Sequence, residues 1–274
     1  MKLSGTATAN EMLALVKQTI DESGLHPRLA VLQVGEDPAS DIYVARKLKV
    51  SESVGVEVEL HKLAATTTEE LIARVEELNG RTDVDAILVQ LPLPEGINTD
   101  AVIRTVSPAK DVDGFHPLNI GSYTTGQAVH TPVLIQSIEW LLGKTGTPLK
   151  GKKAIVVGKS DVFLQPLTYM LSLKGLLVSW VKPQDLPSDE TVTADVLIVA
   201  IGSPHAIAAD MVKPGAIVID IGTNRLPDGK VVGDVDYAAA ENIASFITPT
   251  PGGVGPVTIA ALMWNTLRLA LERP

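Results

Sequence analysis

The sequence predicts an α/β protein of two domains with a cleft between them. Short apolar runs alternate with segments of helical periodicity almost throughout, a pattern typical of helices packed on parallel sheets. Aromatic residues make up only 4% of the sequence, so the core must be built from Ala, Val, Ile and Leu. A chain of 274 residues is long for one domain and sufficient for two. In such proteins the cleft is the default ligand site.

The first half of the chain predicts a βαβαβ unit, which implies a parallel sheet with right-handed crossovers. Thr67 and Glu70 form a capping-box pattern at the start of one of its helices. The predicted strands are 29–34, 56–61 and 86–89, and the predicted helices are 10–22, 39–53 and 68–80.

Segment 107–132 interrupts this pattern with Pro, Gly, Asp and Thr, and we expect the domain junction there. A second alternating set follows it. Segment 248–256 is too rich in Pro and Gly to form a regular element. The predicted strands of this half are 154–157, 176–181, 196–201 and 216–221, and the predicted helices are 132–143 and 257–271.

Composition excludes several classes of protein. The formal net charge of −9 disfavours nonspecific nucleic-acid binding, although a local basic pocket for an anionic substrate is still allowed. The absence of cysteine excludes disulfides, thiolate catalysis and Cys-ligated zinc. The N-terminus lacks a signal-peptide core, and we expect no apolar run as long as a membrane span. A cytoplasmic protein without a membrane partner is the expectation.

The segment SDIYVARKLK places Tyr43 and Lys47 four residues apart on one helix face, with Ser40 one turn earlier. A lysine facing a cleft beside a phenol and apolar neighbours can have a lowered pKa and exchange protons near neutrality. The alternative is a solvated cationic face, since Arg46 and Lys49 are close in sequence.

Two further segments carry polar side chains near strand ends. Gln90 follows a buried strand, where ligands bind in open α/β sheets, although a strand end before a rigid turn explains it equally well. Asp111 and Asp113 alternate in an extended segment, so one could bind an amidine-like edge of a heterocycle. Both could instead be turn residues before Gly114. His116 is expected to be structural, because it has no partner at metal-ligand spacing.

Glycine-rich turns are the remaining candidates. Gly158 ends a predicted strand before a helix, the context of a dinucleotide-binding turn, but only one glycine of the usual fingerprint is present. Gly252, Gly253 and Gly255 permit close ligand approach, and a helix expected after Pro256 could face a polar group. A tight chain reversal is the alternative for this last segment.

Taken in order, these segments resemble the bifunctional methylenetetrahydrofolate dehydrogenase/methenyltetrahydrofolate cyclohydrolase family. The resemblance covers both predicted domains. It rests on VGEDPAS with YVARK, LVQLPLP, KDVDGFHPLNIG, KPGAIVIDIGTNR with KVVGDV, and SFITPTPGGVGPVT.

The resemblance implies a role for each candidate. Lys47 would be the central proton-transfer residue, with Tyr43 over the folate, Gln90 positioning the lysine and Asp113 on the pterin edge. The implied substrate-binding residues are Ser40, Pro251, Gly252, Gly253 and Pro256. The implied cofactor-binding residues are Gly158, Lys159, Ser160, Lys182, Gly202 and Thr223.

The implied chemistry is oxidation of 5,10-methylenetetrahydrofolate with NADP or NAD, followed by hydrolysis of the methenyl cation to 10-formyltetrahydrofolate. Tetrahydrofolate is the substrate carrier, and no metal is required. Residues 1–123 with 256–274 would form the folate-binding catalytic domain, and residues 124–255 a Rossmann-like NAD(P)-binding domain with a parallel sheet. A homodimer formed through the cofactor domain is also implied.

Departures from the family pattern cluster in the cofactor half. Leu164 replaces a glycine and is expected to narrow the pyrophosphate approach, while Pro183 and Thr223 replace other usual residues. Lys159 and Lys182 could pair with a 2′-phosphate, which favours NADP. Two alternatives therefore stay open: a cyclohydrolase with weakened or lost dehydrogenase activity, and a noncatalytic folate-binding relative.

Overall fold

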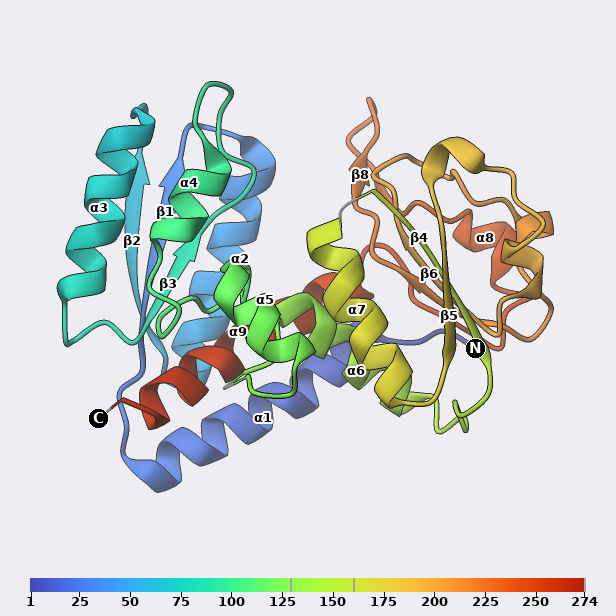
Figure 1. Ribbon diagram of the computed structural model, residues 1–274, viewed down its shortest axis with the longest axis horizontal. Coiled ribbons are helices and arrows are strands. Elements are labelled where there is room, and N and C mark those ends of the chain that lie inside the picture. The colour runs from blue at the N-terminus through green and yellow to red at the C-terminus, as the bar shows by residue number, and fades with distance from the viewer. Residues whose placement is uncertain (129, 160, 274) are drawn as a thin grey trace. The chain divides into compact units, whose positions relative to one another are not determined.

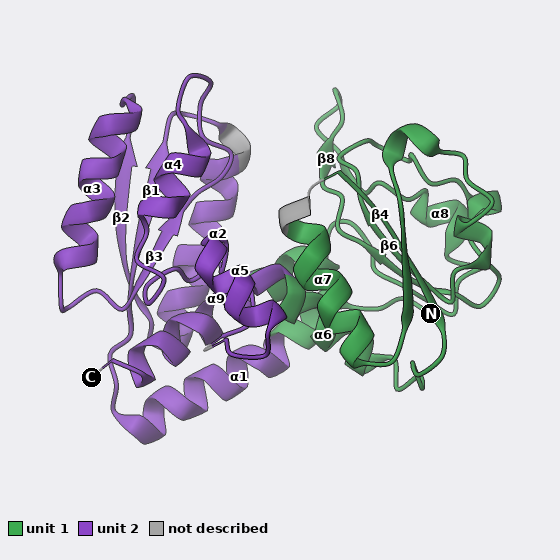
Figure 2. Cartoon of the chain, viewed as in Figure 1, with its two compact units in different colours: residues 1–9, 135–258 green, residues 10–134, 259–274 purple. Residues whose placement is uncertain are grey.

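The computed structural model divides into two compact units (Figure 2). Unit 1 comprises residues 1–9 and 135–258, and unit 2 comprises residues 10–134 and 259–274. The structure describes residues 1–128, 130–159 and 161–273, without the side chains of residues 38, 39, 161 and 162. The prediction of two α/β domains with parallel sheets is confirmed.

Unit 2 is built on a three-stranded parallel sheet of order β2-β1-β3. The strands are β1 (Arg28–Val34), β2 (Glu57–Leu63) and β3 (Ala86–Val89). All but the first residue of β1 are buried, as expected of a central parallel strand. Figure 1 shows α3 and α4 beside this sheet. The helices that lie wholly or mainly in unit 2 are α1 (Gly5–Ser23), α2 (Pro38–Val54), α3 (Thr68–Gly80), α4 (Thr99–Thr105), α5 (Pro117–Thr124) and α9 (Val254–Leu271).

Local signals explain where two of these helices begin. The capping box of α3 is present, since Thr67 Oγ1 accepts from Glu70 N at 3.2 Å and Glu70 Oε2 accepts from Thr67 N at 3.0 Å. Helix α5 lies inside the segment expected to be irregular. Its start is nonetheless encoded, because His116 caps it and Pro117 occupies the first turn, where a missing N–H costs nothing.

Unit 1 contains a five-stranded parallel sheet of order β10-β7-β6-β4-β5, with a small antiparallel hairpin β8-β9. The strands are β4 (Lys153–Gly158), β5 (Leu177–Val181), β6 (Val196–Ala200), β7 (Ile217–Asp220), β8 (Asn224–Arg225), β9 (Val231–Val232) and β10 (Phe246–Ile247). The helices are α6 (Val133–Lys144), α7 (Asp161–Leu173) and α8 (Tyr237–Ala240), with short 3₁₀ turns at Pro183–Asp185, Thr191–Thr193 and Ala209–Met211.

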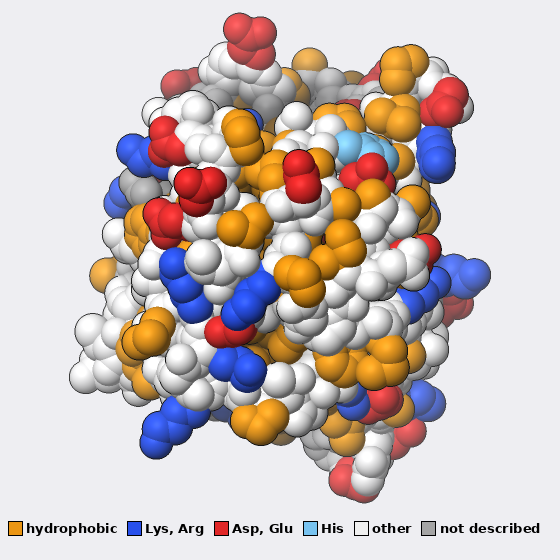
Figure 3. All heavy atoms as spheres, turned by 90° about the vertical axis from the view of Figure 1, so that its right-hand side faces the viewer, with side chains coloured by type: hydrophobic (Ala, Val, Ile, Leu, Met, Phe, Trp, Pro, Cys, Tyr) orange, Lys and Arg blue, Asp and Glu red, His pale blue; other side chains and the backbone are white. Residues whose placement is uncertain are grey.

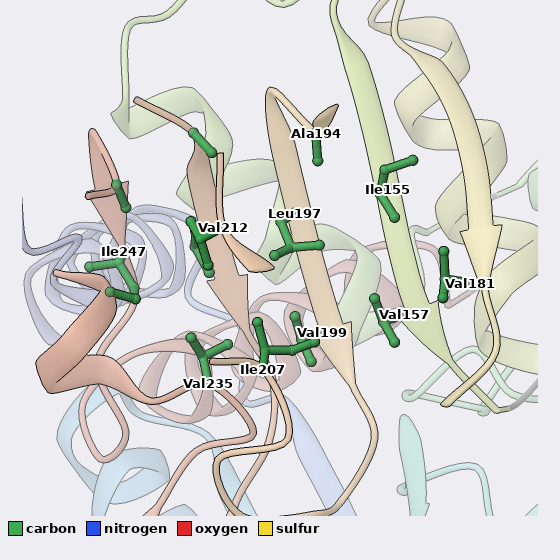
Figure 4. Close-up of a cluster of buried hydrophobic side chains, with 14 of the residues drawn as sticks. Ile155, Val157, Val181, Ala194, Leu197, Val199, Ile207, Val212, Val235 and Ile247 are labelled. Atoms are coloured by element: carbon green, nitrogen blue, oxygen red, sulfur yellow. The ribbon is translucent and has the colours of Figure 1, made fainter. Parts of the chain in front are cut away.

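The core of unit 1 is aliphatic, as the scarcity of aromatic residues predicts. Figure 4 shows Ile155, Leu197 and Val199 on neighbouring strands, with Val181 from the edge strand beside them. These side chains are almost completely buried. Branched side chains of this kind fill the space between parallel strands and the elements that cover them.

The first residues of the chain belong to unit 1. Leu3 N donates to Ile247 O and Ile247 N to Met1 O, so this segment extends the edge of β10. The unit boundaries fall at 9/10, 134/135 and 258/259, and the functional domains of residues 1–123 with 256–274 and of residues 124–255 stay a prediction. These backbone bonds explain why the N-terminal segment groups with the second sheet. The assignment of one ligand to each domain stays a prediction.

Helix α9 corrects the expectation about apolar runs. By length and composition alone, Val254–Leu271 could cross a membrane. However, 67% of the residues in that window are buried inside the protein. It is therefore a core helix whose apolar character serves packing.

Candidate functional site

Helix α2 carries two of the candidate catalytic residues, Tyr43 and Lys47, and Asp37 caps its first turn. Asp37 Oδ2 accepts from Ser40 N at 2.9 Å and from Ser40 Oγ at 2.8 Å. A carboxylate at this position satisfies free N–H groups and suits the positive end of the helix. The Ser40 hydroxyl proton is thereby used, so a ligand could only donate to this oxygen.

Asp41 ties α2 to the sheet of unit 2. Its Oδ1 accepts from Gln33 Nε2 on β1 and from Lys62 Nζ on β2, each at 2.7 Å. Hydrogen bonds from Lys62 and Gln33, together with the positive charge of Lys62, lower the pKa of Asp41. A helix fixed in this way presents its following turns in one orientation.

Lys47 lies two turns into this helix and is buried, with only 8% of its surface exposed. Its Nζ donates to Gln90 Oε1 at 2.7 Å and lies 5.5 Å from the centre of the Tyr43 ring. Gln90 follows β3, and its Nε2 donates to Leu91 O, which fixes the amide orientation. The solvated-face alternative for Lys47 therefore does not describe this structure.

Burial lowers the pKa of Lys47, and the negative charge of Asp113 partly opposes this. For Asp113, burial raises the pKa to about 6, while Lys47 lowers it and Asp111 raises it. Asp113 is half-buried, and it lies close enough to Lys47 for the two charges to act on each other. A desolvated amine beside a carboxyl group is typical of a proton-transfer site.

Asp111 and Asp113 have different surroundings although they alternate in sequence. The Asp111 carboxylate accepts from Gly114 N at 3.2 Å, His116 N at 2.7 Å and Asn119 Nδ2 at 2.9 Å. Gly114 has a φ of +75°, which favours glycine. Asp111 is thus the turn residue, and the turn that it closes carries Asp113.

Asn265 on α9 holds the same turn from the far end of the sequence. Its Nδ2 donates to Val112 O at 3.0 Å and to Thr131 O at 2.9 Å. Val133 N also donates to Asp113 O at 3.1 Å. His130 Nε2 lies 2.8 Å from Asp111 O, and burial lowers the pKa of this imidazole. The neutral ring must therefore donate from Nε2.

Sequence reasoning missed several of these supporting residues. An Asp–Pro pair before a helix is a start signal that could have identified Asp37. The contacts of Gln33, Lys62 and Asn265 join segments far apart in the chain, and no local pattern announces them.

The predicted cofactor-binding residues lie in unit 1, at or after the carboxyl ends of its strands. Gly158 ends β4, Lys182 follows β5 and Gly202 follows β6. Gly202 is exposed, has a φ of +71°, and a Cβ there would meet nothing within 4 Å. A glycine at the end of one parallel strand and a second glycine beside open space after the next strand fit a dinucleotide site.

The other members of this set are less constrained. Lys159 and Thr223 are exposed, and Ser160 lies outside the described residues. Leu164, expected to narrow the pyrophosphate approach, is buried within α7, and its Cδ2 would lie 3.5 Å from a Cβ at Gly158. Its side chain thus packs inward against the strand end.

Residues 251–256 belong to unit 1 and are anchored by the first turn of α1. Gly252 O accepts from Gly5 N at 2.9 Å and from Thr6 N at 3.3 Å. Gly252 has a φ of +99°, and a Cβ at Gly253 would overlap Pro249 O. Glycine is favoured at Gly252 by its backbone conformation and at Gly253 by the close approach of Pro249 O. Helix α9 begins at Val254 and so includes Pro256, which was expected to precede it.

A parallel sheet whose strand ends suit a dinucleotide, together with a buried lysine hydrogen-bonded to a glutamine amide, is typical of an α/β enzyme that uses a dinucleotide cofactor. Two family profiles match the chain. They are described as the tetrahydrofolate dehydrogenase/cyclohydrolase catalytic domain, over residues 3–113, and its NAD(P)-binding domain, over residues 132–273. The chain therefore belongs to the tetrahydrofolate dehydrogenase/cyclohydrolase family.

Individual relatives agree with this assignment. "Bifunctional protein FolD 2" of Myxococcus xanthus is 46% identical over 98% of this chain and 96% of that protein. The crystal structure of the bifunctional enzyme FolD from Campylobacter jejuni has a TM-score of 0.91 at 38% identity, covering 100% of this chain and 99% of that one. The Trypanosoma brucei enzyme, solved with NADP cofactor and an inhibitor, has a TM-score of 0.94 at 29% identity, covering 99% and 97%.

The predicted activity is thus confirmed. The protein is a bifunctional enzyme, a methylenetetrahydrofolate dehydrogenase and a methenyltetrahydrofolate cyclohydrolase. The Rossmann-like character of the second sheet is confirmed with it.

Proposed function

We propose that unit 2 binds the folate along α2 and that Lys47 transfers the protons of the hydrolytic step. The observation that carries this proposal is the 2.7 Å hydrogen bond from a buried Lys47 Nζ to Gln90 Oε1. Burial lowers the pKa of Lys47, so its neutral amine is more populated at a given pH than that of an exposed lysine. Only that form can accept a proton.

In the hydrolysis, water attacks the methenyl carbon and the ring opens at one of its two nitrogens. The water loses one proton as its C–O bond forms. The resulting hydroxyl loses its second proton as the C=O bond forms and the C–N bond breaks, while the departing nitrogen gains one, so one proton is released overall. Lys47 is placed to accept the first proton and to return a proton to nitrogen. Gln90 keeps the amine oriented through the two lone pairs of its amide oxygen.

Other residues of unit 2 bind and orient. Asp113 would accept hydrogen bonds from the amino-bearing pterin edge, where a carboxylate is stronger than a neutral acceptor. Tyr43 provides a ring over which a flat heterocycle can stack. The Ser40 hydroxyl can only accept a hydrogen bond from the substrate, because it donates its own proton to a hydrogen bond with Asp37. The substrate-binding role implied for Pro251, Gly252, Gly253 and Pro256 of unit 1 stays a prediction.

The edge of the unit 1 sheet would hold the dinucleotide through Gly158, Lys159, Ser160, Lys182, Gly202 and Thr223. A bound nicotinamide supplies the hydride acceptor for oxidation of the methylene carbon. Hydride transfer needs the two rings to be oriented and water to be excluded, which fixed loops provide.

We further propose that NADP is the preferred cofactor. Lys182 follows β5, the neighbour of β4, where enzymes using NAD often carry an acidic residue for the ribose. Lys182 is exposed, so a cation is available for a 2′-phosphate.

Changing Lys182 to Glu is expected to raise KM for NADP about tenfold, the equivalent of one charged hydrogen bond, and to leave KM for NAD nearly unchanged. Steady-state kinetics with each cofactor measures this. Lys150→Glu, an exposed lysine before the amino end of β4, is the matched control. Equal effects on NAD and NADP would remove Lys182 from phosphate recognition.

The whole proposal is tested by assaying the purified protein with methylenetetrahydrofolate and each of NAD and NADP, while hydrolysis of methenyltetrahydrofolate is followed separately. Reduction of NADP together with hydrolysis supports it. More efficient reduction of NAD than of NADP would contradict the proposed cofactor preference.

We also propose a homodimer formed through β5. This strand lies at the edge of the unit 1 sheet and pairs only with β4 among the described strands. Leu177 and Trp180 on this strand are 66% and 43% exposed, and Leu173 at the end of α7 is 69% exposed. An apolar edge strand with unpaired backbone groups can pair with a second copy of itself.

The double change Leu177→Glu and Trp180→Glu is expected to convert the dimer to a monomer, because four carboxylates would meet across a two-fold interface. Sedimentation velocity at micromolar concentration measures this. Val192→Glu, an exposed apolar residue outside β5, is the control. A wild-type monomer, or a double variant that stays dimeric, contradicts the proposed interface.

Charge and side-chain composition bear on three other kinds of partner: nucleic acid, metal ions and membranes. Figure 3 shows acidic and basic side chains intermixed on one face, and the net charge is −9, so nucleic acid is not a proposed partner. Within the described residues no cluster of three or more His, Asp or Glu could hold a metal, and no metal is assigned. A cytoplasmic enzyme without a membrane partner is proposed.

A further inference from the structure

The loop after β6 forms an anion-binding site that is occupied by a carboxylate of the same chain. Ile201 N and Gly202 N donate to Asp234 Oδ2 at 2.6 and 2.9 Å, and Ser203 N donates to Asp234 Oδ1 at 2.9 Å. Consecutive backbone N–H groups that converge in this way form a concavity that binds phosphate in many proteins. Here a carboxylate occupies it.

Asp234 is completely buried, with 0% of its surface exposed. A fourth donor, Asn224 Nδ2, lies 2.8 Å from its Oδ1. Each carboxylate oxygen therefore accepts two hydrogen bonds, and all four donors belong to unit 1. A buried charge is tolerated when it is satisfied in this way, and charge-assisted bonds of this kind are stronger than neutral ones.

A second buried carboxylate supports the first. Asp220, the last residue of β7, accepts through Oδ1 from Gly222 N at 2.9 Å and from Asp234 N at 3.1 Å. Its Oδ2 accepts from Val235 N at 2.9 Å. Asp220 thus fixes the backbone of Asp234 and also the turn that begins at Gly222 and continues into Thr223.

Two glycines leave room for these carboxylates. A Cβ at Gly222 would overlap Asp234 Cγ, and a Cβ at Gly233 would overlap Asp220 Oδ2. Neither glycine has a positive φ among the described values, so close approach and not backbone freedom explains them. This accounts for glycine in the DIGTNR and VVGDV segments.

We propose that Asp234, supported by Asp220, is a positioning residue for the dinucleotide: it fixes the loop of Gly202 directly and the turn of Thr223 through Asp220. The inference rests on the proposed cofactor role of those two positions. It also means that the N–H groups of residues 201–203 do not bind a phosphate of the cofactor. The loop contacts the dinucleotide through its exposed surface instead.

The test is Asp234→Asn in the full-length enzyme. Whichever way the new amide is turned, its NH₂ group faces at least one N–H of the loop, so the loop must shift. KM for NADP and the Kd from fluorescence titration with NADP are expected to rise about tenfold or more, the equivalent of a lost charged hydrogen bond. Hydrolysis of methenyltetrahydrofolate, whose proposed proton-transfer residues Lys47 and Gln90 lie in unit 2, is expected to stay within about twofold of wild type.

Asp236→Asn is the matched control, because Asp236 caps α8 through Ala239 N and no hydrogen bond to residues 201–203 is found for its described side chain. An Asp234→Asn enzyme with a lowered Tm but an unchanged KM for NADP overturns the positioning role, since a purely structural residue behaves in that way.

Should Asp234→Asn fail to fold, Asn224→Ala carries the test, because it removes one side-chain donor to Asp234, with its longer 3.5 Å bond to Val232 O, and leaves the three N–H donors of the loop in place. A rise of about threefold in KM for NADP supports the proposal, and an unchanged KM overturns it. Wild-type enzyme that neither binds nor reduces NADP refutes the proposed cofactor site itself. Wild-type binding with no effect of either variant refutes only the role of Asp234.

Discussion

Lys47→Met is expected to reduce hydrolysis of methenyltetrahydrofolate by about 10²- to 10⁴-fold, the usual contribution of a positioned acid–base group. Methionine fills a similar volume without a titratable group, so the buried position of Lys47 is preserved without its proton chemistry. Hydride transfer depends mainly on orientation and should fall much less. Separate spectroscopic assays of reduction and hydrolysis measure the two effects.

The matched control is Lys49→Met on the same helix. Lys49 is exposed, whereas Lys47 is buried and bound to Gln90, so the control should keep both activities. A Lys47→Met enzyme that hydrolyses at the wild-type rate would remove the proton-transfer role from this lysine. An equal loss of both activities would instead indicate that Lys47 chiefly binds or orders the site.

At Asp113 the expected result is a change in both binding and pH dependence. Because burial raises its pKa to about 6, Asp113 is charged above that pH and becomes neutral as the pH falls through it. Wild-type KM for the folate should therefore rise below about pH 6, as the carboxylate that accepts from the pterin edge is lost. In Asp113→Asn, KM should be raised about 10- to 100-fold at every pH, with no inflection near 6.

Asp100→Asn serves as the control for Asp113. Asp100 is an exposed residue on α4 that pairs with Arg104, so neither KM nor its pH profile should change. KM profiles between pH 5 and 8 at saturating cofactor decide the question. Persistence of the inflection in Asp113→Asn would assign it to another group.

Much of the fold could be predicted because the buried parallel strands are short apolar runs. The strand Ala86–Val89 and the helix Thr68–Gly80 have the predicted bounds, since one is fully buried and the other begins at a capping box. Helices α4 and α5 were missed because they are too short to show apolar periodicity. Their start signals, Asn98 and the His116–Pro117 pair, lie in segments rich in turn residues.

The candidate site was predictable only in part. Helical spacing places Tyr43 and Lys47 on one face, and the strand end places Gln90 near a ligand edge. Strict alternation would give Asp111 and Asp113 one orientation. The turn at Gly114 instead directs the Asp111 carboxylate to backbone N–H groups. The burial of Leu164 depends on how α7 packs on β4, which no local pattern encodes.

The Asn265 bonds have a consequence for how the protein is made. The ribosome completes the strands of unit 2 early, and the turn of residues 111–116 emerges soon afterwards. The amide that joins Val112 O to Thr131 O emerges only with the last helix, after the whole second sheet. The bonds that join the turn of Asp113 to the last helix therefore form only when synthesis is nearly finished, after the strands of both sheets exist.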